Sequence, residues 1–463
     1  MQMIYGVKDK PKFSQTIIFA IQQLLAIMAA TIAVPAIVGN DMTASAALFG
    51  AGVGTLTYQL FTKFKSPVFL GSSFAFIGPM LAAFAGANAV GYLGYLGLII
   101  GAVCAGLVYV VIAIIVKFVG VNWIDKIMPA AVIGPTVALI GLSLAGAAIN
   151  DVFSYGEKVT FGVSSYFVMK PNIWFSLICA LVTLIVVVIC SVYGKKMVNL
   201  IPFIIGILAG YAVALIFTLI GIKTNNPDMV IIDFKPFYDL AKNGVVSVST
   251  FVSVPKFSFL EAAKGLGGFK WSYVASVAIA YVPVAFVVFA EHLADHKNLS
   301  SIIESDLTKD PGLHRTLLGD GVGSMLGAFF GGCPNTTYGE SVGCVAITKN
   351  ASIVTIVTTA ILAIVVSFVS PFVAFLDSIP GCVMGGVCIT LYGFIAVSGL
   401  KMIQKVNFED NRNVFTASVI LITGIGGMAL AISEVYITNI ACALILGILT
   451  NVMLSGKKKK EEE

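Results

Sequence analysis

Apolar runs of about twenty residues recur along almost the whole chain, and short stretches of charged and turn-forming residues separate them. A helix needs about 20 consecutive apolar residues to cross the hydrocarbon core of a bilayer. The pattern therefore predicts an all-α membrane protein with fourteen membrane-spanning segments. They are expected near residues 16–39, 45–62, 67–87, 94–116, 127–149, 172–192, 199–221, 272–293, 314–331, 336–347, 352–375, 380–400, 413–431 and 435–455.

Small polar residues interrupt two of these segments, the third and the tenth. The interrupted segment is Leu70-Gly-Ser-Ser-Phe-Ala-Phe-Ile-Gly-Pro79 in the third span, and it is Cys333-Pro-Asn-Thr-Thr-Tyr-Gly-Glu340 at the start of the tenth. Fourteen spans divide into two sets of seven, and an odd number per set gives the second set the opposite orientation, as in a 7+7 inverted repeat. The interruptions then occupy corresponding positions, where short unwound or β-like breaks are expected to form a binding site.

Composition supports a membrane protein. Hydrophobic residues make up 58% of the 463 residues and charged residues only 11%, whereas soluble domains carry roughly 25% charged residues. The formal net charge of +5 comes from lysines in short connections and in the terminal run 457–460, without a patch that contains interleaved aromatic residues. We therefore expect membrane lipid around the chain and no nucleic-acid partner.

The basic residues also predict an orientation. They fall in alternate connections, which places both termini in the cytoplasm of a multi-pass protein of the cell (plasma or inner) membrane. The first apolar run lacks the pattern of a cleavable signal and is expected to be a permanent span. The long segment from Lys223 to Lys270 is expected outside the cell, with strand-like stretches at 230–232 and 245–254 forming a partly ordered hairpin.

Motifs for an enzyme, a cofactor or a metal site are missing from the sequence. The eight cysteines form no CxxC pair and are expected to be reduced packing residues. His292 and His296 have a spacing that could hold a metal, but no second ligand cluster accompanies them, so hydrogen bonding or proton relay is expected instead. Phosphate-binding loops and nucleophile motifs are absent as well. We expect no catalytic residues and no cofactor, and an ion gradient would have to drive uphill transport.

Two glutamates stand out because an ionised carboxylate is costly in a bilayer. Glu291 follows the apolar run 282–290, and it either lines a cavity or marks the cytoplasmic end of a helix. Glu340 comes directly after the second break, at the first turn of a half-helix, where it either binds a ligand or simply caps the helix. Two carboxylates on facing elements would accept N–H donors from a neutral heterocycle and would suit an anion poorly.

Other residues in the breaks complete the expected site. Phe74 and Phe76 can offer a stacking face to a planar ring, and backbone amides near Ser72 to Phe74, including that of Ser73, and near Gly339 can bind carbonyl oxygens. Tyr338 belongs to the same break as Gly339. In the first span, Gln22 and Gln23 are costly in hydrocarbon and either line the cavity or bridge helices.

Several short sequence motifs in both halves of the chain resemble those of one family. They are Leu70-Gly-Ser-Ser-Phe-Ala-Phe-Ile77, Ala290-Glu-His292, Asp310-Pro-Gly-Leu-His-Arg315, and Pro334-Asn-Thr-Thr-Tyr-Gly-Glu340 followed by Gly343 and Ala346-Ile-Thr348. With them the chain resembles the nucleobase/ascorbate transporter family, and within it the bacterial uracil permeases.

The resemblance implies an architecture. A core domain of spans 1–4 and 8–11 would move against a gate domain of spans 5–7 and 12–14 in an elevator-type mechanism, and the protein would be a proton-coupled homodimer. Along the chain, residues 1–150 hold spans 1–4 and the start of the gate, and residues 151–270 hold spans 6–7 with the long extracellular loop. Residues 271–378 hold spans 8–11, and residues 379–463 hold spans 12–14 with a cytoplasmic tail.

The resemblance also implies a substrate. In the uracil permeases, the residues that match Glu291, Glu340, Phe74 and Gly339 bind or line the site of the base. The expected function is uracil:H⁺ symport, and a xanthine or purine permease of the same family remains the alternative. An anion transporter of related fold is disfavoured, because its site would be positive or neutral. A membrane-embedded enzyme would have only the His292 and His296 pair for its chemistry.

Three positions depart from the family pattern. The Gln-His pair of the first span reads Gln22-Gln23, the histidine four residues after the first glutamate is Asp295 with His296 beside it, and the asparagine after the second glutamate is Ser341. The titrating group is therefore expected to be one of the carboxylates. Burial and neighbouring carboxylates disfavour the charged form, so Asp295, Glu291 or Glu340 is expected to take up the coupled proton. The full expected proton-coupling set is Asp295, Glu291, His296 and Gln23.

Overall fold

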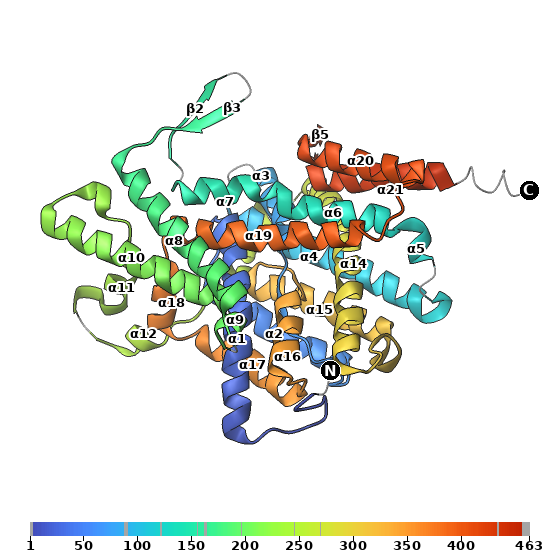
Figure 1. Cartoon of the computed structure of the whole chain (residues 1–463), viewed down its shortest axis with the longest axis horizontal. Coiled ribbons are helices and arrows are strands. Elements are labelled where there is room, and N and C mark those ends of the chain that lie inside the picture. The colour runs from blue at the N-terminus through green and yellow to red at the C-terminus, as the bar shows by residue number, and fades with distance from the viewer. Residues whose placement is uncertain are drawn as a thin grey trace, which may run out of the picture.

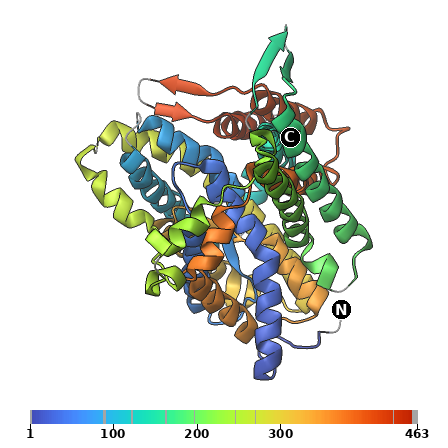
Figure 2. The same cartoon turned by 90° about the vertical axis from the view of Figure 1, so that its left-hand side faces the viewer.

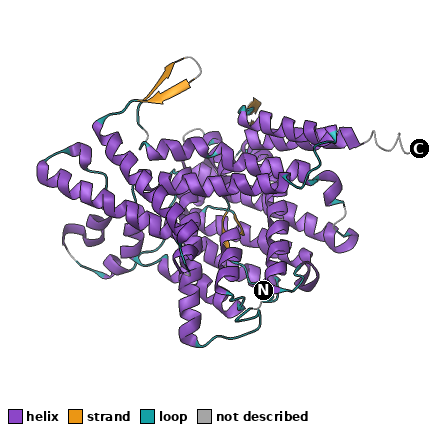
Figure 3. Cartoon of the chain, in the orientation of Figure 1, coloured by secondary structure: helices purple, strands orange, loops and turns teal. Residues whose placement is uncertain are grey.

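The computed structural model describes residues 3–87, 91–120, 123–154, 156–161, 164–195, 197–244, 246–268, 270–432 and 435–455. Most of them are helical (Figure 1; Figure 3). The longer helices are α1 (Phe13–Val38), α2 (Ala44–Phe61), α3 (Ile77–Gly86), α4 (Gly91–Val119), α6 (Ala130–Ser143), α7 (Ala145–Val152), α8 (Pro171–Tyr193), α10 (Pro202–Thr224), α14 (Trp271–Ile303), α15 (Leu313–Gly331), α16 (Gly339–Thr348), α17 (Ile353–Val366), α18 (Ser370–Asp377), α19 (Gly381–Ile403), α20 (Asn411–Ile425) and α21 (Asn439–Ser455).

Short elements connect these helices. The short helices are α5 (Ile124–Ile127), α9 (Met197–Leu200), α11 (Lys235–Tyr238), α12 (Val248–Phe251), α13 (Ser258–Lys264), and the single turns η1 (Phe74–Phe76), η2 (Pro227–Met229), η3 (Asp239–Gly244), η4 (Leu266–Gly268) and η5 (Thr308–Gly312). Three antiparallel strand pairs are formed by β1 (Leu70–Ser72) with β4 (Asn335–Thr337), β2 (Lys158–Phe161) with β3 (Ser164–Phe167), and β5 (Leu430–Ile432) with β6 (Val435–Ile437).

Each predicted span contains at least one helix. In the described part of the chain, seven helical stretches are long and apolar enough to cross a membrane, which makes the chain a multi-pass membrane protein. The total of fourteen spans and the inverted repeat stay predictions. The span expected near 272–293 lies within a helix that extends beyond it, to Ile303. It continues because His292, His296 and Leu299 are buried against neighbouring elements and not released into a loop.

The hairpin expected between Lys223 and Lys270 was also wrong. The described residues of this segment form short helices and turns from η2 to α13. The apolar stretch at 230–232 packs on α10, where the amides of Ile231 and Ile232 both donate to Thr218 Oγ1 at 3.0 Å. Local bonds of this kind satisfy the backbone without a partner strand. The hairpins lie elsewhere, and β2–β3 projects from the helical body (Figure 1; Figure 2).

The helices pack in two groups. Helices α1 to α4 contact α14 to α17, and helices α6 to α10 contact α19 to α21. Within the first group, α2 and α15 approach closely because glycines face each other: a Cβ added to Gly50 would lie 2.6 Å from the carbonyl oxygen of Gly327. The domain boundaries given by the sequence stay predictions, but the grouping leaves a seam between the two sets of helices.

The two interrupted spans meet at the centre of the first group. Strands β1 and β4 pair antiparallel, with Leu70 opposite Thr337 and Ser72 opposite Asn335. The pairing continues beyond the strands, since the amide of Ser73 donates to the carbonyl of Pro334 (2.9 Å). Each strand is followed by a short helix, η1 and α3 in one case and α16 in the other. The predicted β-like breaks are therefore present, and the paired strands satisfy backbone groups that would otherwise be unpaired in hydrocarbon.

Candidate functional site

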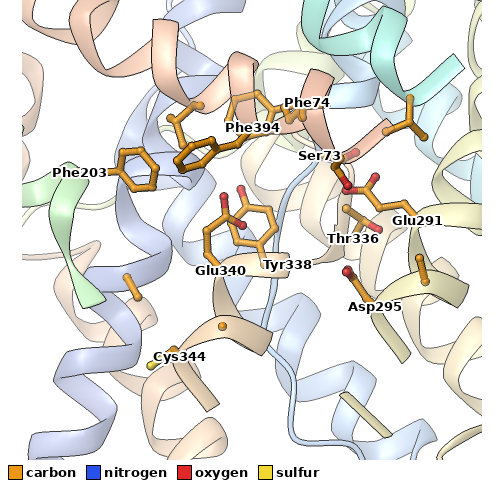
Figure 4. Close-up of a pocket in the computed structure, with 18 of the residues that line it drawn as sticks. Ser73, Phe74, Phe203, Glu291, Asp295, Thr336, Tyr338, Glu340, Cys344 and Phe394 are labelled. Atoms are coloured by element: carbon orange, nitrogen blue, oxygen red, sulfur yellow. The ribbon is translucent and has the colours of Figure 1, made fainter. Parts of the chain in front are cut away.

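A cavity of about 460 Å³ lies in the seam between the two groups of helices (Figure 4). One wall carries the polar residues of η1, α14, β4 and α16, and the opposite wall is formed by α6, α10 and α19 with the α8–α10 connection. The lining residues are Ala26, Ser73, Phe74, Ala75, Val137, Ile140, Ser191, Asn199, Leu200, Pro202, Phe203, Glu291, Ala294, Asp295, Thr336, Tyr338, Gly339, Glu340, Gly343, Cys344, Ile347, Leu391, Phe394, Ile395, Ser398 and Met402.

The charged side chains that line the cavity are all carboxylates. Glu291, Asp295 and Glu340 line the cavity, whereas none of the lining residues in the described part of the chain is Lys, Arg or His. Ionised carboxylates only accept hydrogen bonds, so the cavity suits N–H donors or a cation. An anion would meet three like charges. The lining therefore favours a neutral hydrogen-bonding molecule, with protons available to offset the charge of the acids.

Glu291 lies inside a helix and not at its end. α14 continues for twelve residues beyond it, to Ile303, so the interpretation as a helix-end carboxylate is wrong. Asp295 follows one turn later, on the same face, because residues four apart in a helix are neighbours. One oxygen of Asp295 accepts a hydrogen bond from Thr337 Oγ1 (2.8 Å). Helix α14 thus presents two carboxylates to the cavity, and one of them is tied to β4.

Glu340 occupies the first turn of α16, as the sequence predicts. The first amides of a helix have no partner within it and point toward its amino-terminal end. Here that end borders the cavity, with Gly339 and Glu340 in the lining. The side chain of the next residue, Ser341, accepts hydrogen bonds from Gln23 Nε2 (2.5 Å) and from the amide of Phe69 (2.9 Å). These bonds fasten α16 to α1 and to the segment that leads into β1.

The first break contributes Ser73 and Phe74. The Ser73 hydroxyl is buried at 1% exposure and has no hydrogen-bond partner among the described residues, so it is free to donate to a ligand. The Ser73 amide donates to the carbonyl of Pro334 (2.9 Å) and is therefore engaged within the protein, while the expectation for the amides from Ser72 to Phe74 as a group stays a prediction. Phe74 is half-buried at the cavity wall and makes an edge contact with Tyr392, with ring centroids 5.9 Å apart.

Tyr338 joins the two breaks. Its ring lies across Gly71, where any Cβ would overlap the ring atoms, and its hydroxyl donates to the carbonyl of Ser72 (2.7 Å). Its ring also lines the cavity. Tyr338 is therefore both part of the wall and a tie between β1 and β4, and glycine is required at position 71 to make room for it.

Two residues of the expected proton-coupling set lie behind the wall. Gln23 is bonded to Ser341, and His296 Nε2 lies 2.7 Å from the hydroxyl of Tyr58; neither lines the cavity. The Nδ1 atom of His296 faces the carbonyl of His292 at 2.8 Å, so this nitrogen carries the hydrogen. The Tyr58 hydroxyl donates to Ser66 Oγ (2.7 Å), and Ser66 Oγ lies 3.4 Å from the same Nε2 atom. Whether either residue takes part in proton coupling stays a prediction.

His292 belongs to the same buried network. Its Nδ1 atom lies 2.9 Å from Asp320 Oδ2 and its Nε2 atom lies 3.0 Å from Thr316 Oγ1. Both ring nitrogens of His292 thus contact side chains of α15. Thr336 Oγ1, on the cavity wall, lies 3.5 Å from the same Asp320 oxygen. The network connects the cavity wall to the interior of the first helix group.

The sequence did not single out the opposite wall. Phe203 on α10 and Phe394 on α19 are in edge contact, with centroids 5.9 Å apart, and face the polar wall across the cavity (Figure 4). Thr336, on the polar wall, was also missed. Single aromatic residues in an apolar span carry no signal that distinguishes a cavity from lipid, and only the tertiary packing separates the two.

Comparison with known proteins places the chain among transporters. A model of the Permease family matches residues 14–432. The chain is 38% identical over 462 residues to the uracil permease of Bacillus caldolyticus, and this alignment covers 99% of this chain and 96% of that protein. It is 34% identical over 445 residues to the uracil permease of Escherichia coli K12, with 96% of this chain and 92% of that protein covered. It is 30% identical over 452 residues to that organism's putative pyrimidine permease, with 97% of this chain and 91% of that protein covered.

Solved structures share the fold at low sequence identity. The transmembrane domain of the cyanobacterial bicarbonate transporter BicA matches with a TM-score of 0.56 at 15% identity, covering 96% of this chain and 99% of that one. The murine anion transporter Slc26a9 in its inward-facing state matches with a TM-score of 0.60 at 12% identity, covering 97% of this chain and 69% of that one. At these identities the likeness extends to the fold alone.

Proposed function

This chain belongs to the Permease family, and on that premise we propose that it carries uracil across the membrane together with a proton. The chain is a permease and not an enzyme. The observation that carries the proposal is a cavity with three carboxylates, an unpaired serine hydroxyl and an aromatic ring on one wall, in a chain similar over nearly its full length to uracil permeases.

The chemistry of uracil matches this wall. The ring has two N–H donors, which Glu291 and Glu340 can accept, and two carbonyl oxygens, which the Ser73 hydroxyl and the first amides of α16 can bind. Phe74 offers a face for stacking, and base stacking on an aromatic side chain contributes roughly 1–3 kcal/mol. Every one of these groups lies on the same side of the cavity, so a bound base would be held by one group of helices.

This asymmetry supports an elevator-type mechanism. The wall opposite the ligand groups is largely apolar, with Val137, Ile140, Phe203 and Phe394, although Ser191, Asn199 and Ser398 also line it. Such a surface offers few hydrogen bonds that must break when the first group of helices slides past it. A protonated site would also cross the apolar seam at lower cost than one with unpaired charges. We further propose that two copies of the chain associate in the membrane, as the family resemblance implies.

Uptake into vesicles tests the substrate. Vesicles that contain the purified chain should accumulate labelled uracil when an inward proton gradient is imposed, and a protonophore should abolish the accumulation. Labelled xanthine tests the purine alternative, and labelled sulfate tests an anion transporter of the same fold. Accumulation of xanthine without uracil, or of sulfate, would overturn the proposal.

A further inference from the structure

The segment before α1 forms a strap that is fastened to the far end of the half-helix carrying Glu340. We define the amino-terminal strap as residues 3–12. The amide of Ile4 donates to the carbonyl of Lys349 (2.9 Å), and the carbonyl of Tyr5 accepts from the amide of Ala351 (2.8 Å). Further along, the carbonyl of Val7 accepts from the amide of Ile353 (3.2 Å). The strap therefore lies along the connection from α16 to α17.

Apolar contacts hold the inner side of this strap. Met3 and Val7 pack against a buried cluster that includes Val345 of α16 and Leu299 of α14. The hydroxyl of Ser352 adds a bond to the carbonyl of Asp9 (2.6 Å). The inner side of the strap therefore packs against the protein, and the outer side is the one that can bind another molecule.

The outer side is basic. Lys8, Lys10 and Lys12 are exposed, and so is Lys349 at the end of α16, next to the point where the strap is bonded. None of these four lysines has an ion-pair partner among the residues that the structure describes. The carboxylate of Asp9, the acid nearest in sequence, accepts from the amide of Gly6 (2.7 Å).

The position of α1 puts these charges at the membrane surface. The helix has 26 residues, and at 1.5 Å per residue it is about 39 Å long, longer than the ~30 Å hydrocarbon core. Its start extends beyond α16 and α17, with the strap turning back from it (Figure 1; Figure 2). The exposed Phe13 (82%) and Ile18 (56%) begin the lipid-facing side just after Lys12.

We propose that the outer side of the strap binds the headgroups of anionic phospholipids, and that this binding tightens the hold of the strap on α16. The phosphates supply the negative charge that the four lysines lack within the protein. Clusters of four or more basic residues beside a membrane helix are typical of binding to anionic lipid. Because the strap is bonded to the α16–α17 connection, occupancy by lipid stabilises the carboxyl-terminal end of the helix whose first turn bears Glu340.

Hydrogen exchange of the full chain in nanodiscs tests this inference directly. The probe lipid is phosphatidylglycerol, added to phosphatidylcholine. The amides of Ile4, Ala351 and Ile353 should exchange more slowly when phosphatidylglycerol is present. The triple variant Lys8→Gln/Lys10→Gln/Lys12→Gln should lose this protection, and Lys8→Arg/Lys10→Arg/Lys12→Arg should keep it. Native mass spectrometry should show at least a tenfold loss of phosphatidylglycerol affinity in the glutamine variant, since each lysine near a lipid surface contributes about fivefold.

The matched control removes three exposed lysines elsewhere: Lys195→Gln/Lys401→Gln/Lys405→Gln. It should behave like the unmodified chain. Equal exchange in both lipids, or the same loss in the control as in the strap variant, would overturn the inference. So would equal protection by inorganic phosphate in phosphatidylcholine, because the site would then bind a small anion and not a lipid. None of these readouts uses uracil, so their outcome is independent of the proposed substrate.

Discussion

At the scale of single residues, the cavity is defined by carboxylates that are not matched by a cation. Glu291 and Asp295 lie one turn apart on α14, and Glu340 comes from α16. Among the described residues, only the Asp295 side chain of these three acids is hydrogen-bonded to a neighbouring side chain, that of Thr337. The three acids therefore differ in surroundings although they share one cavity, and substitutions should separate substrate binding from proton coupling.

Glu291→Gln should abolish uracil binding. The amide replaces one acceptor oxygen with a donor that faces the N–H of the base, and a hydrogen bond to a charged group contributes about 1.5–3 kcal/mol even before that repulsion. Equilibrium binding of labelled uracil measures the effect. Glu157→Gln, on the exposed β2–β3 side of the molecule, is the control and should bind normally. Near-normal affinity in the Glu291 variant would remove Glu291 from the site.

Phe74→Ala should weaken uracil binding by about 1–3 kcal/mol through the loss of stacking, with expression and folding largely preserved. Phe74→Leu distinguishes stacking from packing, since leucine fills much of the space but has no aromatic face. If the leucine variant binds uracil as tightly as the unmodified chain, Phe74 serves only to pack the wall. Isothermal titration of both variants gives the comparison.

Asp295→Asn should separate exchange from accumulation. The amide can still fill the position next to Thr337, so uracil should exchange for uracil across the vesicle membrane. It cannot take up a proton, so accumulation driven by an inward proton gradient should fall severalfold or more. Uptake between pH 5.5 and 8 provides the measurement. Should accumulation match the unmodified chain over this range, the proton must reside on Glu291 or Glu340.

At the scale of secondary-structure elements, the site depends on how the half-helix α16 is anchored. Ser341 holds it at the cavity end through Gln23 and the Phe69 amide, and the strand pair β1–β4 fixes its starting point. These contacts connect α1, β1 and α16, which are far apart in the sequence. The position of Glu340 is thus set by residues that do not themselves touch the cavity.

Ser341→Ala should lower both stability and affinity. The substitution leaves the buried Phe69 amide and the Gln23 side chain without an acceptor, and each unsatisfied group costs about 1–3 kcal/mol. Thermal unfolding in detergent and uracil binding report the two effects. If the hydrogen bond between Gln23 and Ser341 causes these effects, the double variant Gln23→Ala/Ser341→Ala should lose less free energy of unfolding than the two single variants together. Strict additivity would show that the two side chains act independently.

At the scale of the whole molecule, the cavity lies where two groups of helices meet, with ligand groups on one side and a largely apolar wall on the other. A ligand that binds the folded chain stabilises it by mass action. Uracil at a hundred times its dissociation constant should raise the free energy of unfolding by about 2.7 kcal/mol. Thermal unfolding with uracil, xanthine and sulfate measures this. Stabilisation by sulfate but not by uracil would favour an anion transporter of the shared fold.

The sequence by itself indicated a membrane protein and the positions of its apolar helices. Hydropathy is a local property, because each segment enters the bilayer according to its own residues. The sequence also located the two breaks and the residues Glu291, Glu340, Phe74 and Ser73, since polar groups are conspicuous in apolar segments. Their resemblance to a known family supplied the proposed substrate class.

Only the tertiary structure decided which residues meet across the chain. The pairing of β1 with β4, the contact of Gln23 with Ser341, and the bond between His292 and Asp320 join positions that no local pattern relates. It also extended α14 beyond its predicted span and corrected the segment between Lys223 and Lys270, because burial against neighbours and hydrogen bonds to Thr218 outweighed local preference there. Hydropathy states that a side chain avoids water; whether it then faces lipid, another helix or the cavity depends on packing between distant segments.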